Sequence, residues 1–356
     1  MGARRVEKVV ITGGTGFLGE ALTRQLLGRE GSPALRAEAV VQLDLSPPAP
    51  ALATADPRVA WLRGDVRDRA SLVPAFRGAD VVFHCAALVD WGRARRDALL
   101  EVNVAGTANV LAACRDAGVP VLVHTSTMDV VYEGRAIPRG DETLPYPERF
   151  ETDYCESKAL AEKQVLAWAA SSERPALAVV RPVGMYGEGD PYHVTQSLLQ
   201  AEKGALVARL GDGRAIFSHV YVGNVAHGMI LAAERLLAGD AQARGRVYFV
   251  CDDEEPNNFF DFMAPIMEGL GHRFPPRWAS IPAGPAKLVA GAVARVARAR
   301  GTEPTVTPES INMICRDFAF TDARARRELG YAAAFSGEEA RARTIAWFRA
   351  HGPVRR

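Results

Sequence analysis

Three evenly spaced glycines near the N-terminus limit the folds open to this chain. Gly13, Gly16 and Gly19 stand between the apolar run 9–11 and the segment 17–27, in which leucine recurs every four residues. The apolar run predicts a strand, and the period of four predicts a helix. In such a unit the first glycine makes the tight turn, the second lets the backbone approach a pyrophosphate, and the third lets the helix pack closely on the strand. The pattern therefore predicts a loop that binds a dinucleotide at a helix N-terminus.

Strands and helices alternate after this loop. Val, Ile and Leu dominate the runs that predict strands, which is typical of a parallel sheet covered by helices on both faces. The sequence thus predicts an α/β fold with a doubly wound parallel sheet of the Rossmann type. Further strands are predicted at 39–43, 59–62, 79–84, 119–125 and 176–181, and helices at 71–76, 97–117 and 157–170.

The pattern changes after Arg181-Pro182, where helices lengthen, loops become rich in glycine and the stretch 274–285 is rich in proline. We therefore expect a smaller C-terminal lobe that binds the substrate. The predicted division is a dinucleotide-binding domain over 1–183, to which 219–252 return, and a substrate-binding lobe over 184–218 and 253–350.

Composition and charge narrow the classes of partner. Hydrophobic residues make up 48% of the chain, and its 43 basic residues nearly balance 42 acidic ones, for a net charge of +1. Such a chain has no overall positive field, so nucleic acid is not expected as a partner. The five cysteines form no C-x-x-C pair, and no metal site is predicted. Because the N-terminus shows no apolar leader segment, we expect a cytoplasmic protein.

Asp44 ends the second predicted strand. A carboxylate there can accept hydrogen bonds from the adenosine ribose and repels a 2′-phosphate, which favours NAD over NADP. The alternative is that Asp44 only caps a turn. Asp65 and Val66, after the third strand, are expected beside the adenine. The other predicted cofactor contacts are Gly13, Thr15, Gly16, Phe17, Leu18 and Gly19 in the glycine loop, and the small residues Cys85, Ala86 and Ala87 after the fourth strand.

Tyr154 and Lys158 are four residues apart at the start of a predicted helix, a spacing that sets both side chains on one face. An adjacent ammonium favours the phenolate. We therefore expect Lys158 to lower the pKa of Tyr154, so that the phenol exchanges a proton with an alcohol or ketone near neutral pH. Thr125, Ser126 and Thr127 end the strand before it, where ligands of doubly wound sheets bind. One of these hydroxyls is expected to hold the substrate oxygen, unless they only satisfy backbone groups of the turn.

With these motifs the chain resembles the extended short-chain dehydrogenase/reductases over nearly its whole length, and within them the 3β-hydroxysteroid dehydrogenase and sterol-4α-carboxylate 3-dehydrogenase family. The stretches 220–226 and 251–253 resemble the steroid branch in particular. The resemblance implies that Tyr154 is the general acid/base and that Lys158 holds the nicotinamide ribose. It also implies that Thr127, or else Ser126, is the third hydroxyl residue. Further implied contacts are Asn103, Thr125, Pro182 and Val183 for the cofactor, and Met185, Tyr186 and Phe217 for the substrate.

Phe217 stands where related enzymes acting on sugar nucleotides commonly place an arginine against a diphosphate. An aromatic side chain cannot neutralise a diphosphate, which favours an apolar substrate unless Arg214 takes that part. The segment 285–300 predicts a basic amphipathic helix, with Lys287, Arg295 and Arg298 opposite an apolar stripe. It is too charged to span a bilayer, and it either covers the substrate lobe as a lid or makes a peripheral membrane contact.

These features predict an enzyme that interconverts a 3β-hydroxyl and a 3-ketone on a sterol or steroid with NAD, with decarboxylation where the substrate bears a C4 carboxylate. One alternative is an NADPH-dependent reductase of another hydrophobic ketone or β-keto acid. The other is a non-catalytic dinucleotide-binding regulator, which the fold also supports. By analogy with related chains, a homodimer is expected through the helices 97–117 and 157–170.

Overall fold

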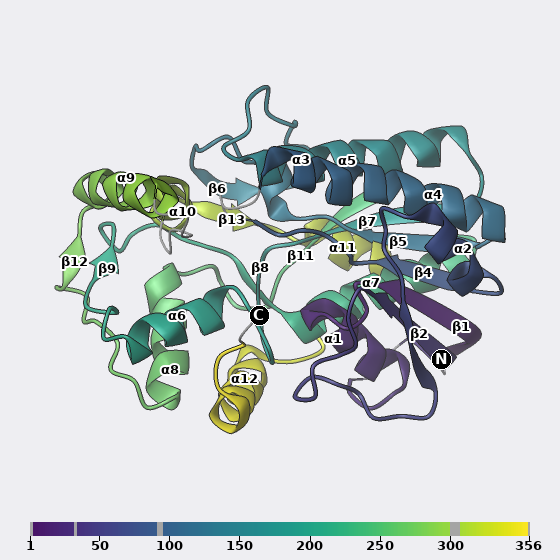
Figure 1. The fold of residues 1–356 in the computed structure, drawn as a ribbon, viewed down its shortest axis with the longest axis horizontal. Helices are drawn as coiled ribbons and strands as arrows, with labels where there is room; N and C mark the ends of the chain where they lie inside the picture. The colour runs from purple at the N-terminus through teal and green to yellow at the C-terminus, as the bar shows by residue number, and fades with distance from the viewer. Residues whose placement is uncertain (1–2, 32–33, 91–94, 300–306, 355–356) are drawn as a thin grey trace.

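A seven-stranded parallel sheet lies at the centre of the computed structural model, which describes residues 3–31, 34–90, 95–299 and 307–354 (Figure 1). The strand order β11-β7-β5-β4-β1-β2-β3 means that the chain begins inside the sheet and builds outward in both directions. The predicted doubly wound fold is confirmed. The strands are β1 (Arg4–Thr12), β2 (Leu35–Asp44), β3 (Val59–Arg63), β4 (Val81–His84), β5 (Val121–Thr125), β7 (Ala176–Pro182) and β11 (Arg246–Val250).

Helices cover both faces of this sheet. Successive side chains of a strand point to opposite faces, so in β1 Val9 and Ile11 pack into one core cluster and Val10 into the other, all three fully buried. Both faces are therefore apolar and need a helical layer. One layer holds α1 (Phe17–Leu26) and α7 (Val222–Leu237), and the other holds α2 (Arg69–Phe76), α4 (Gly106–Ala117) and α5 (Asp153–Ser171).

The helix predicted over 97–117 is present but irregular. It consists of α3 (Arg96–Leu99), a π-helical stretch η1 (Leu100–Ala105) and α4. Segments of this wider type often occur at functional sites. Here the wide turn contains Asn103, whose side chain is buried.

The helix predicted over 157–170 starts earlier, at Asp153. Thr152 is its N-cap, because the Thr152 hydroxyl accepts a hydrogen bond from the backbone N–H of Cys155 at 3.2 Å. The cap places Tyr154 in the first turn of α5, close to the end of β5.

A C-terminal lobe lies at one end of the sheet (Figure 1). β11 rejoins the central sheet beside β7, while the predicted domain boundaries themselves stay a prediction. Three short parallel pairs lie outside the central sheet: β8 with β10, β9 with β12 and β6 with β13. The remaining elements are η2 (Met128–Val131), β6 (Ile137–Gly140), β8 (Gly184–Tyr186), α6 (His193–Glu202), β9 (Arg209–Leu210), β10 (His219–Tyr221), α8 (Phe259–Gly269), β12 (Ser280–Ile281), α9 (Ala283–Ala299), α10 (Pro308–Ile314), β13 (Phe318–Phe320), α11 (Ala323–Leu329) and α12 (Gly337–His351). The predicted helix 285–300 is present as α9, although residue 300 and the side chain of Arg298 lie outside the described residues.

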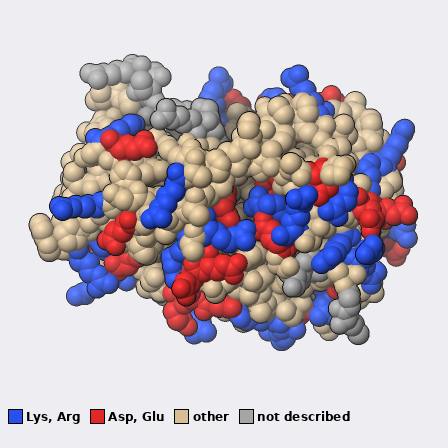
Figure 2. Space-filling model, turned by 90° about the horizontal axis from the view of Figure 1, so that it is seen from below, with Lys and Arg blue, Asp and Glu red and all other residues tan. Residues whose placement is uncertain are grey.

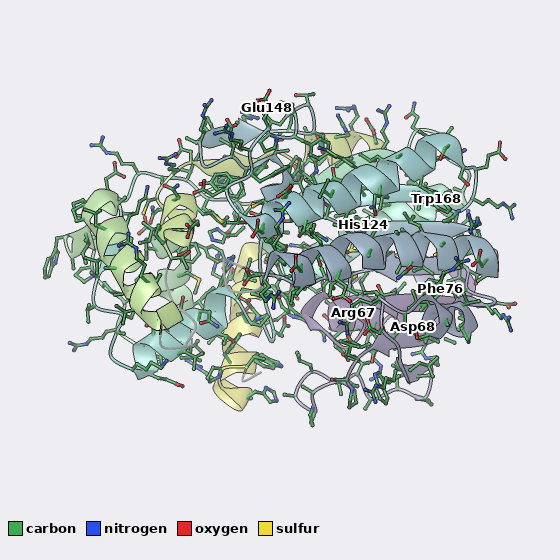
Figure 3. All side chains as sticks on the ribbon, turned by 45° about the horizontal axis from the view of Figure 1, so that its top comes forward. Arg67, Asp68, Phe76, His124, Glu148 and Trp168 are labelled. Atoms are coloured by element: carbon green, nitrogen blue, oxygen red, sulfur yellow. The ribbon has the colours of Figure 1, made fainter. Side chains whose placement is uncertain are left out.

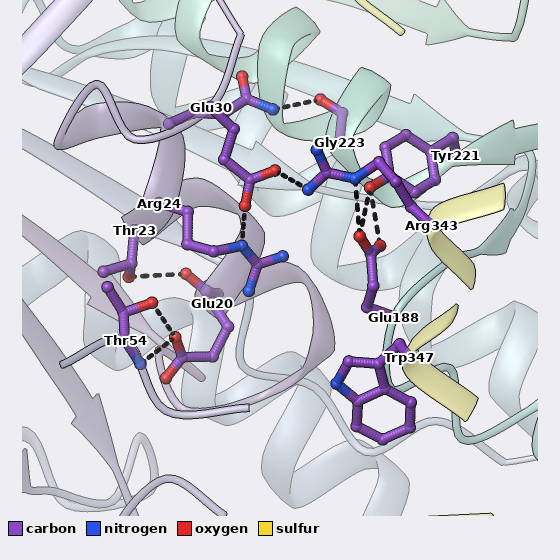
Figure 4. A network of polar contacts seen from close by, with 12 residues as sticks. Glu20, Thr23, Arg24, Glu30, Thr54, Glu188, Tyr221, Gly223, Arg343 and Trp347 are labelled. Carbon is purple, nitrogen blue, oxygen red and sulfur yellow. Dashed lines mark hydrogen bonds and ion pairs between the residues drawn. The ribbon is translucent and has the colours of Figure 1, made fainter. Parts of the chain in front are cut away.

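The last helix is fastened to the first domain by an ion-pair network (Figure 4). Arg343 of α12 pairs with Glu30, which follows α1, and donates to Glu188 at 2.8 Å. The hydroxyl of Tyr221 also donates to Glu188, at 2.7 Å. Nearby, the indole N–H of Trp347 donates to the carbonyl of Ala51, in the loop after β2, at 3.2 Å. The network therefore joins α12, α1 and the start of the C-terminal lobe.

The surface seen from below carries basic and acidic side chains next to one another (Figure 2). This face has no broad region of a single charge sign. Within the described ranges, no helix has the length and apolar character needed to cross a bilayer.

Candidate active site

The glycine loop between β1 and α1 leaves no room for side chains. Gly13 has φ of +68°, and a Cβ on it would lie 2.8 Å from the backbone nitrogen of Ala86. A Cβ on Gly19 would lie 2.4 Å from the carbonyl oxygen of Gly13, closer than non-bonded atoms approach. The loop is held in place by the Gly13 N–H, which donates to the carbonyl of Leu43 at 2.9 Å. This is the close backbone packing that a pyrophosphate loop requires.

The N-terminus of α1 is open to an anion. Its N-cap is Gly16, so no side chain accepts a hydrogen bond from the first N–H groups of the helix. Beside it, the Asp44 carboxylate accepts hydrogen bonds from the backbone N–H groups of Thr15 at 3.2 Å and Leu45 at 2.8 Å. Phe17 and Leu18 begin the helix and are buried. The loop and Asp44 therefore lie together and fit a dinucleotide.

Asp65, predicted beside the adenine, is engaged by its neighbour. The guanidinium of Arg67 donates to both carboxylate oxygens of Asp65, the shortest contact being 2.6 Å, and it lowers the pKa of that carboxyl. Figure 3 shows Arg67 and Asp68 on the loop that leads into α2. Val66 is buried, and its Cγ2 atom would lie 2.8 Å from a Cβ on Gly106 of α4. Asp65 would therefore contact an adenine while it is paired with Arg67.

The residues after β4 lie against the glycine loop. The Cys85 N–H donates to the carbonyl of Thr12 at 3.0 Å, and the Ala86 N–H lies 3.4 Å from the Thr12 hydroxyl. Asn103 fixes the segment that follows, because its amide bonds the N–H of Leu88 at 2.8 Å and its carbonyl at 3.0 Å. The same amide donates to Ser157 of α5 at 3.0 Å. Asn103 thus ties the loop after β4 to the helix that carries Tyr154.

Two buried histidines lie near this site, and they line neither of the two cavities described below. His84 contacts the hydroxyls of Thr12 at 2.8 Å and Thr107 at 3.0 Å, and burial lowers its pKa to about 3. His124 of β5 lies inside the molecule (Figure 3), and burial, with the charge of Lys158, lowers its pKa well below the ordinary value. Both rings are therefore neutral.

Tyr154 faces a small cavity at the carboxyl end of β5. Its side chain is 8% exposed, it lines that cavity together with Asp129, and its hydroxyl is hydrogen-bonded to Thr127. Thr127 in turn donates to the Oδ2 atom of Asp129 at 2.7 Å. Tyr154, Thr127 and Asp129 therefore form one chain of polar groups.

The predicted effect of Lys158 on Tyr154 is wrong for the protein without ligands. Burial, followed by the charge of Asp129, raises the pKa of Tyr154 well above its usual value. Lys158 makes no hydrogen bond to the phenol among the described residues, and its ammonium donates to the backbone carbonyl of Thr125 at 2.8 Å. Burial also lowers the pKa of Lys158 itself, to about 8. In this state the phenol keeps its proton near neutral pH.

The choice between Thr127 and Ser126 follows from the contacts of Ser126. Its hydroxyl donates to Glu162, which is fully buried and pairs with Arg181 at 2.5 Å. The Tyr146 hydroxyl donates to the same carboxylate at 2.6 Å. The Ser126 hydroxyl is therefore taken up by a buried ion pair, and Thr127 is the hydroxyl beside Tyr154.

Pro182 and Val183 follow Arg181 of this ion pair at the end of β7, and both are buried.

Asp129 is a residue that the sequence analysis missed. It begins a short helical turn after β5, in the sequence Thr127-Met128-Asp129, and its Oδ1 atom is buried without a hydrogen-bond partner among the described residues. Burial raises the pKa of Asp129 to about 6. Its position two residues after Thr127 was the available signal, since an acidic residue so close to a strand end lies at the ligand edge of the sheet.

Replacing Asp129 by asparagine is expected to change how stability depends on pH. Because burial raises the pKa of Asp129 from near 4 to about 6, the protonated carboxyl favours the folded state. This stabilisation is complete below about pH 4 and is lost as the pH rises through about 6. Between about pH 5 and about pH 7.5, the free energy of unfolding should shift in favour of Asp129→Asn by about 1.5 kcal/mol, measured by urea unfolding.

The matched control for that measurement is Asp141→Asn. Hydrogen bonds from Thr143 lower the pKa of Asp141, so this carboxyl is ionised over the whole range. The difference between Asp141→Asn and wild type should therefore stay constant with pH. A constant difference for Asp129→Asn as well would contradict the burial of an ionisable Asp129.

A separate chamber of about 1160 Å³ lies beside this site, toward the C-terminal lobe. It shares Asp90, Ser310 and Met313 with the small cavity at Tyr154. Among the residues that the structure describes, no Arg or Lys lines either cavity. The chamber thus suits a largely apolar molecule about the size of a drug or lipid.

Of the three predicted substrate residues, Phe217 lines the chamber and is 1% exposed. Arg214, the alternative cation, is exposed and lines neither cavity. Met185 and Tyr186 also line neither cavity, and the Tyr186 hydroxyl donates to Asp252 at 3.0 Å instead. Of the three predicted substrate residues, Phe217 is thus the one that lines the chamber.

Comparison with protein families gives a match over residues 10–282 to the 3-beta hydroxysteroid dehydrogenase/isomerase family. The chain is 36% identical over 340 residues to a 3 beta-hydroxysteroid dehydrogenase/Delta 5-->4-isomerase of Mycobacterium tuberculosis, covering 94% of this chain and 88% of that protein. It is 32% identical over 348 residues to a mouse (Mus musculus) sterol-4-alpha-carboxylate 3-dehydrogenase, decarboxylating, covering 97% and 91% respectively.

Solved structures show the same fold. The crystal structure of gox2253 matches with a TM-score of 0.74 and 28% identity, covering 98% of this chain and 100% of the other. The NAD complex of UDP-glucose 4-epimerase from Thermus thermophilus matches with a TM-score of 0.71 and 24% identity, covering 97% and 99%. The sheet, its helical layers and the lobe therefore form a shared architecture.

Proposed function

This chain belongs to the 3-beta hydroxysteroid dehydrogenase/isomerase family, and from that membership we propose that it interconverts a 3β-hydroxyl and a 3-ketone on a sterol or steroid with NAD. It is accordingly an oxidoreductase of the short-chain dehydrogenase/reductase type. The observation that carries the proposal is the position of Tyr154, hydrogen-bonded to Thr127, in a small cavity that shares Asp90, Ser310 and Met313 with a large chamber whose described lining includes no Arg or Lys.

The chemistry divides between the cofactor and the residues of the chain. Oxidation of a secondary alcohol removes one proton from oxygen and one hydride from carbon. A bound dinucleotide supplies the hydride acceptor, and the glycine loop with Asp44 would hold it. In the reduction direction the protonated phenol of Tyr154 gives its proton to the oxygen of the forming alcohol; in the oxidation direction it would have to enter the step as the phenolate, and it then takes the proton of the hydroxyl. Thr127, which is hydrogen-bonded to Tyr154, would orient the substrate oxygen. Lys158 holds its ammonium at the carbonyl of Thr125, beside both groups.

The chamber favours a neutral substrate over a C4-carboxylate. The small cavity at Tyr154 beside it is lined by Asp129, Glu151 and Glu309, whose carboxyl groups repel a second carboxylate. Among the described residues, neither lining contains an Arg or Lys that would pair with a substrate carboxylate. We therefore propose a hydroxysteroid without that group, so decarboxylation is not part of the proposed reaction.

The proposal is tested by following NADH absorbance with purified protein and a panel of neutral 3β-hydroxysteroids, C4-carboxylated sterols and hydrophobic ketones. Reduction of NAD by the neutral steroids alone is the expected result. Turnover of ketones only with NADPH would favour the alternative reductase. Binding of the dinucleotide without turnover on any member of the panel would favour a regulator.

Asp44 is proposed to select NAD. Replacing it with alanine removes the carboxylate that stands at the loop and that would repel a 2′-phosphate. We expect Asp44→Ala to raise KM for NAD by about 10-fold and to lower KM for NADP, with kcat nearly unchanged, since one charge-assisted hydrogen bond contributes about 1.5–3 kcal/mol. Asp44→Asn, which keeps the size of the side chain, serves as the control for loop structure. If the ratio of KM for NAD to KM for NADP were unchanged in both variants, the proposal would be contradicted.

The remaining assignments follow the sequence. We propose that the cofactor residues after β4 and around Asn103 contact the nicotinamide half, and that the protein acts as a homodimer. The dimer proposal is checked by sedimentation velocity, in which a monomer at micromolar concentration would contradict it.

A further inference from the structure

The segment 45–58 joins β2 to β3 without a helix or strand of its own. Parallel strands are usually connected through a helix, whose backbone hydrogen bonds are internal. Four prolines lie within this segment, and proline has no N–H group to donate. The segment begins directly after Asp44, the residue proposed to select NAD. Its position therefore depends on side chains that reach it from other elements.

A buried carboxylate of α1 holds this segment, and Figure 4 shows its contact with Thr54. Glu20 is 0% exposed, and its Oε2 atom accepts hydrogen bonds from the Thr54 hydroxyl at 2.7 Å and from the Thr54 N–H at 3.2 Å. Its Oε1 atom accepts a hydrogen bond from the side-chain amide of Gln42 at 2.9 Å. Gln42 lies in β2, two residues before Asp44. One carboxylate therefore holds both the strand before Asp44 and the segment after it.

Glu20 also lies next to the glycine loop, in the first turn of α1. A Cβ on Gly14 would lie 2.7 Å from the Cα atom of Gln42, so the loop packs directly on the residue whose amide Glu20 binds. The loop also bonds the start of the segment, because the Thr15 hydroxyl donates to the carbonyl of Ser46 at 3.2 Å. Displacing either partner of Glu20 would therefore disturb the loop that faces the pyrophosphate.

Two other contacts of the segment are nearer the surface. Arg29 pairs with Asp56 at 2.8 Å, and the side chain of Arg29 is 49% exposed. The contact of Trp347 with Ala51 is exposed as well. Exposed ion pairs contribute little to stability, whereas hydrogen bonds to a buried carboxylate are strong. Glu20 is thus the contact that we expect to fix the segment most firmly.

We propose that Glu20 is a positioning residue for the cofactor. Through Gln42 and Thr54 it holds Asp44 where that carboxylate receives the ribose hydroxyls of NAD and repels the 2′-phosphate of NADP. Glu20 is fully buried and acts only through these neighbours. This inference rests on the proposed selection of NAD by Asp44, and the experiment below separates the two.

Titration of the full-length protein with NADH and with NADPH, followed by isothermal titration calorimetry without substrate, tests the role of Glu20. Glu20→Leu removes the acceptor and leaves an apolar side chain in the buried position. We expect the ratio of Kd for NADPH to Kd for NADH to fall by about 10-fold, mainly through weaker binding of NADH. Glu20→Gln keeps a carbonyl acceptor and should recover most of the wild-type ratio. A folded Glu20→Leu protein with the wild-type ratio would overturn the proposal.

Thr54→Val keeps the test decisive if Glu20→Leu does not fold. This variant removes the hydroxyl that donates to Glu20 and leaves the Thr54 N–H in place. The same ratio should fall by about threefold, since one of the hydrogen bonds to the carboxylate is lost. An unchanged ratio in Thr54→Val overturns the proposal as well.

Glu142→Leu is the matched control for the loss of a buried carboxylate. The side chain of Glu142 is 3% exposed and accepts a hydrogen bond from the N–H of Phe249 in β11 at 2.9 Å, away from the glycine loop. Both dissociation constants should equal those of wild type. Asp44→Ala in the same titration separates the two proposals. A changed ratio in Asp44→Ala with an unchanged ratio in Glu20→Leu refutes the role of Glu20 alone, whereas an unchanged ratio in Asp44→Ala refutes the selection of NAD by Asp44.

Discussion

Replacing Tyr154 with phenylalanine is expected to lower kcat by about 10²–10⁴-fold, the range typical for loss of a general acid/base. The substitution removes one hydroxyl from a buried site and leaves the ring in place, so the fold and the dinucleotide loop should be unaffected. KM for the cofactor should therefore stay near the wild-type value, which places the loss in the chemical step. Steady-state kinetics and quenching of protein fluorescence by NADH measure the two quantities.

Tyr132→Phe is the matched control for this variant. Tyr132 is fully buried, packs at a tilt against Phe318 with ring centroids 4.5 Å apart, and has a hydroxyl without a hydrogen-bond partner among the described residues. Removal of that hydroxyl should leave kcat within about twofold of wild type. If Tyr154→Phe behaved in the same way as the control, proton transfer by Tyr154 would be refuted.

The second large effect is expected at Gly19. A Cβ there would lie 2.4 Å from the Gly13 oxygen and 2.5 Å from the Gly14 oxygen, both backbone atoms that cannot turn aside. Gly19→Ala must therefore displace the loop that faces the pyrophosphate. We expect affinity for NADH to fall by about 10–100-fold, which corresponds to the cost of about 1–3 kcal/mol for overpacking one methyl group.

Gly284→Ala controls for the general effect of a methyl group on this chain. Gly284 lies in α9, and nothing lies within 4 Å of the position of its added Cβ. The Gly284→Ala protein should bind NADH with the affinity of wild type. Isothermal titration calorimetry gives both dissociation constants, and circular dichroism establishes that each variant is folded. A Gly19→Ala protein that binds NADH normally would show that the loop does not form the pyrophosphate site.

Periodicity predicted the central sheet because its strands are buried on both faces. The strands β1, β4, β5 and β7 each contain a short run of apolar residues in which Val, Ile and Leu are frequent, and this pattern separates them from loops. The short strands of the C-terminal lobe lack such a signal. β9 and β12 have two residues each and are formed by pairing between distant segments, which no local pattern records.

The candidate site was predicted only in part, because its contacts depend on tertiary packing. Gly13 and Asp44 could be placed from their positions relative to strand ends. The hydrogen bond of Ser126 to Glu162 could not be predicted, since Ser126 follows β5, Glu162 lies 36 residues later in α5, and only the packing of this helix on the sheet brings them together. The pKa of Tyr154 was misjudged for a related reason: helical spacing shows where Lys158 lies but not how deeply the phenol is buried.

The contact of the last helix with the first has a consequence for how the protein is made. Arg343 and Trp347 join segments about 300 residues apart in the chain, Glu30 and the loop at Ala51. A ribosome releases α12 only when translation is complete, so the loop that flanks Asp44 lacks this support throughout synthesis. Nascent chains should consequently bind the dinucleotide tightly only after translation has ended.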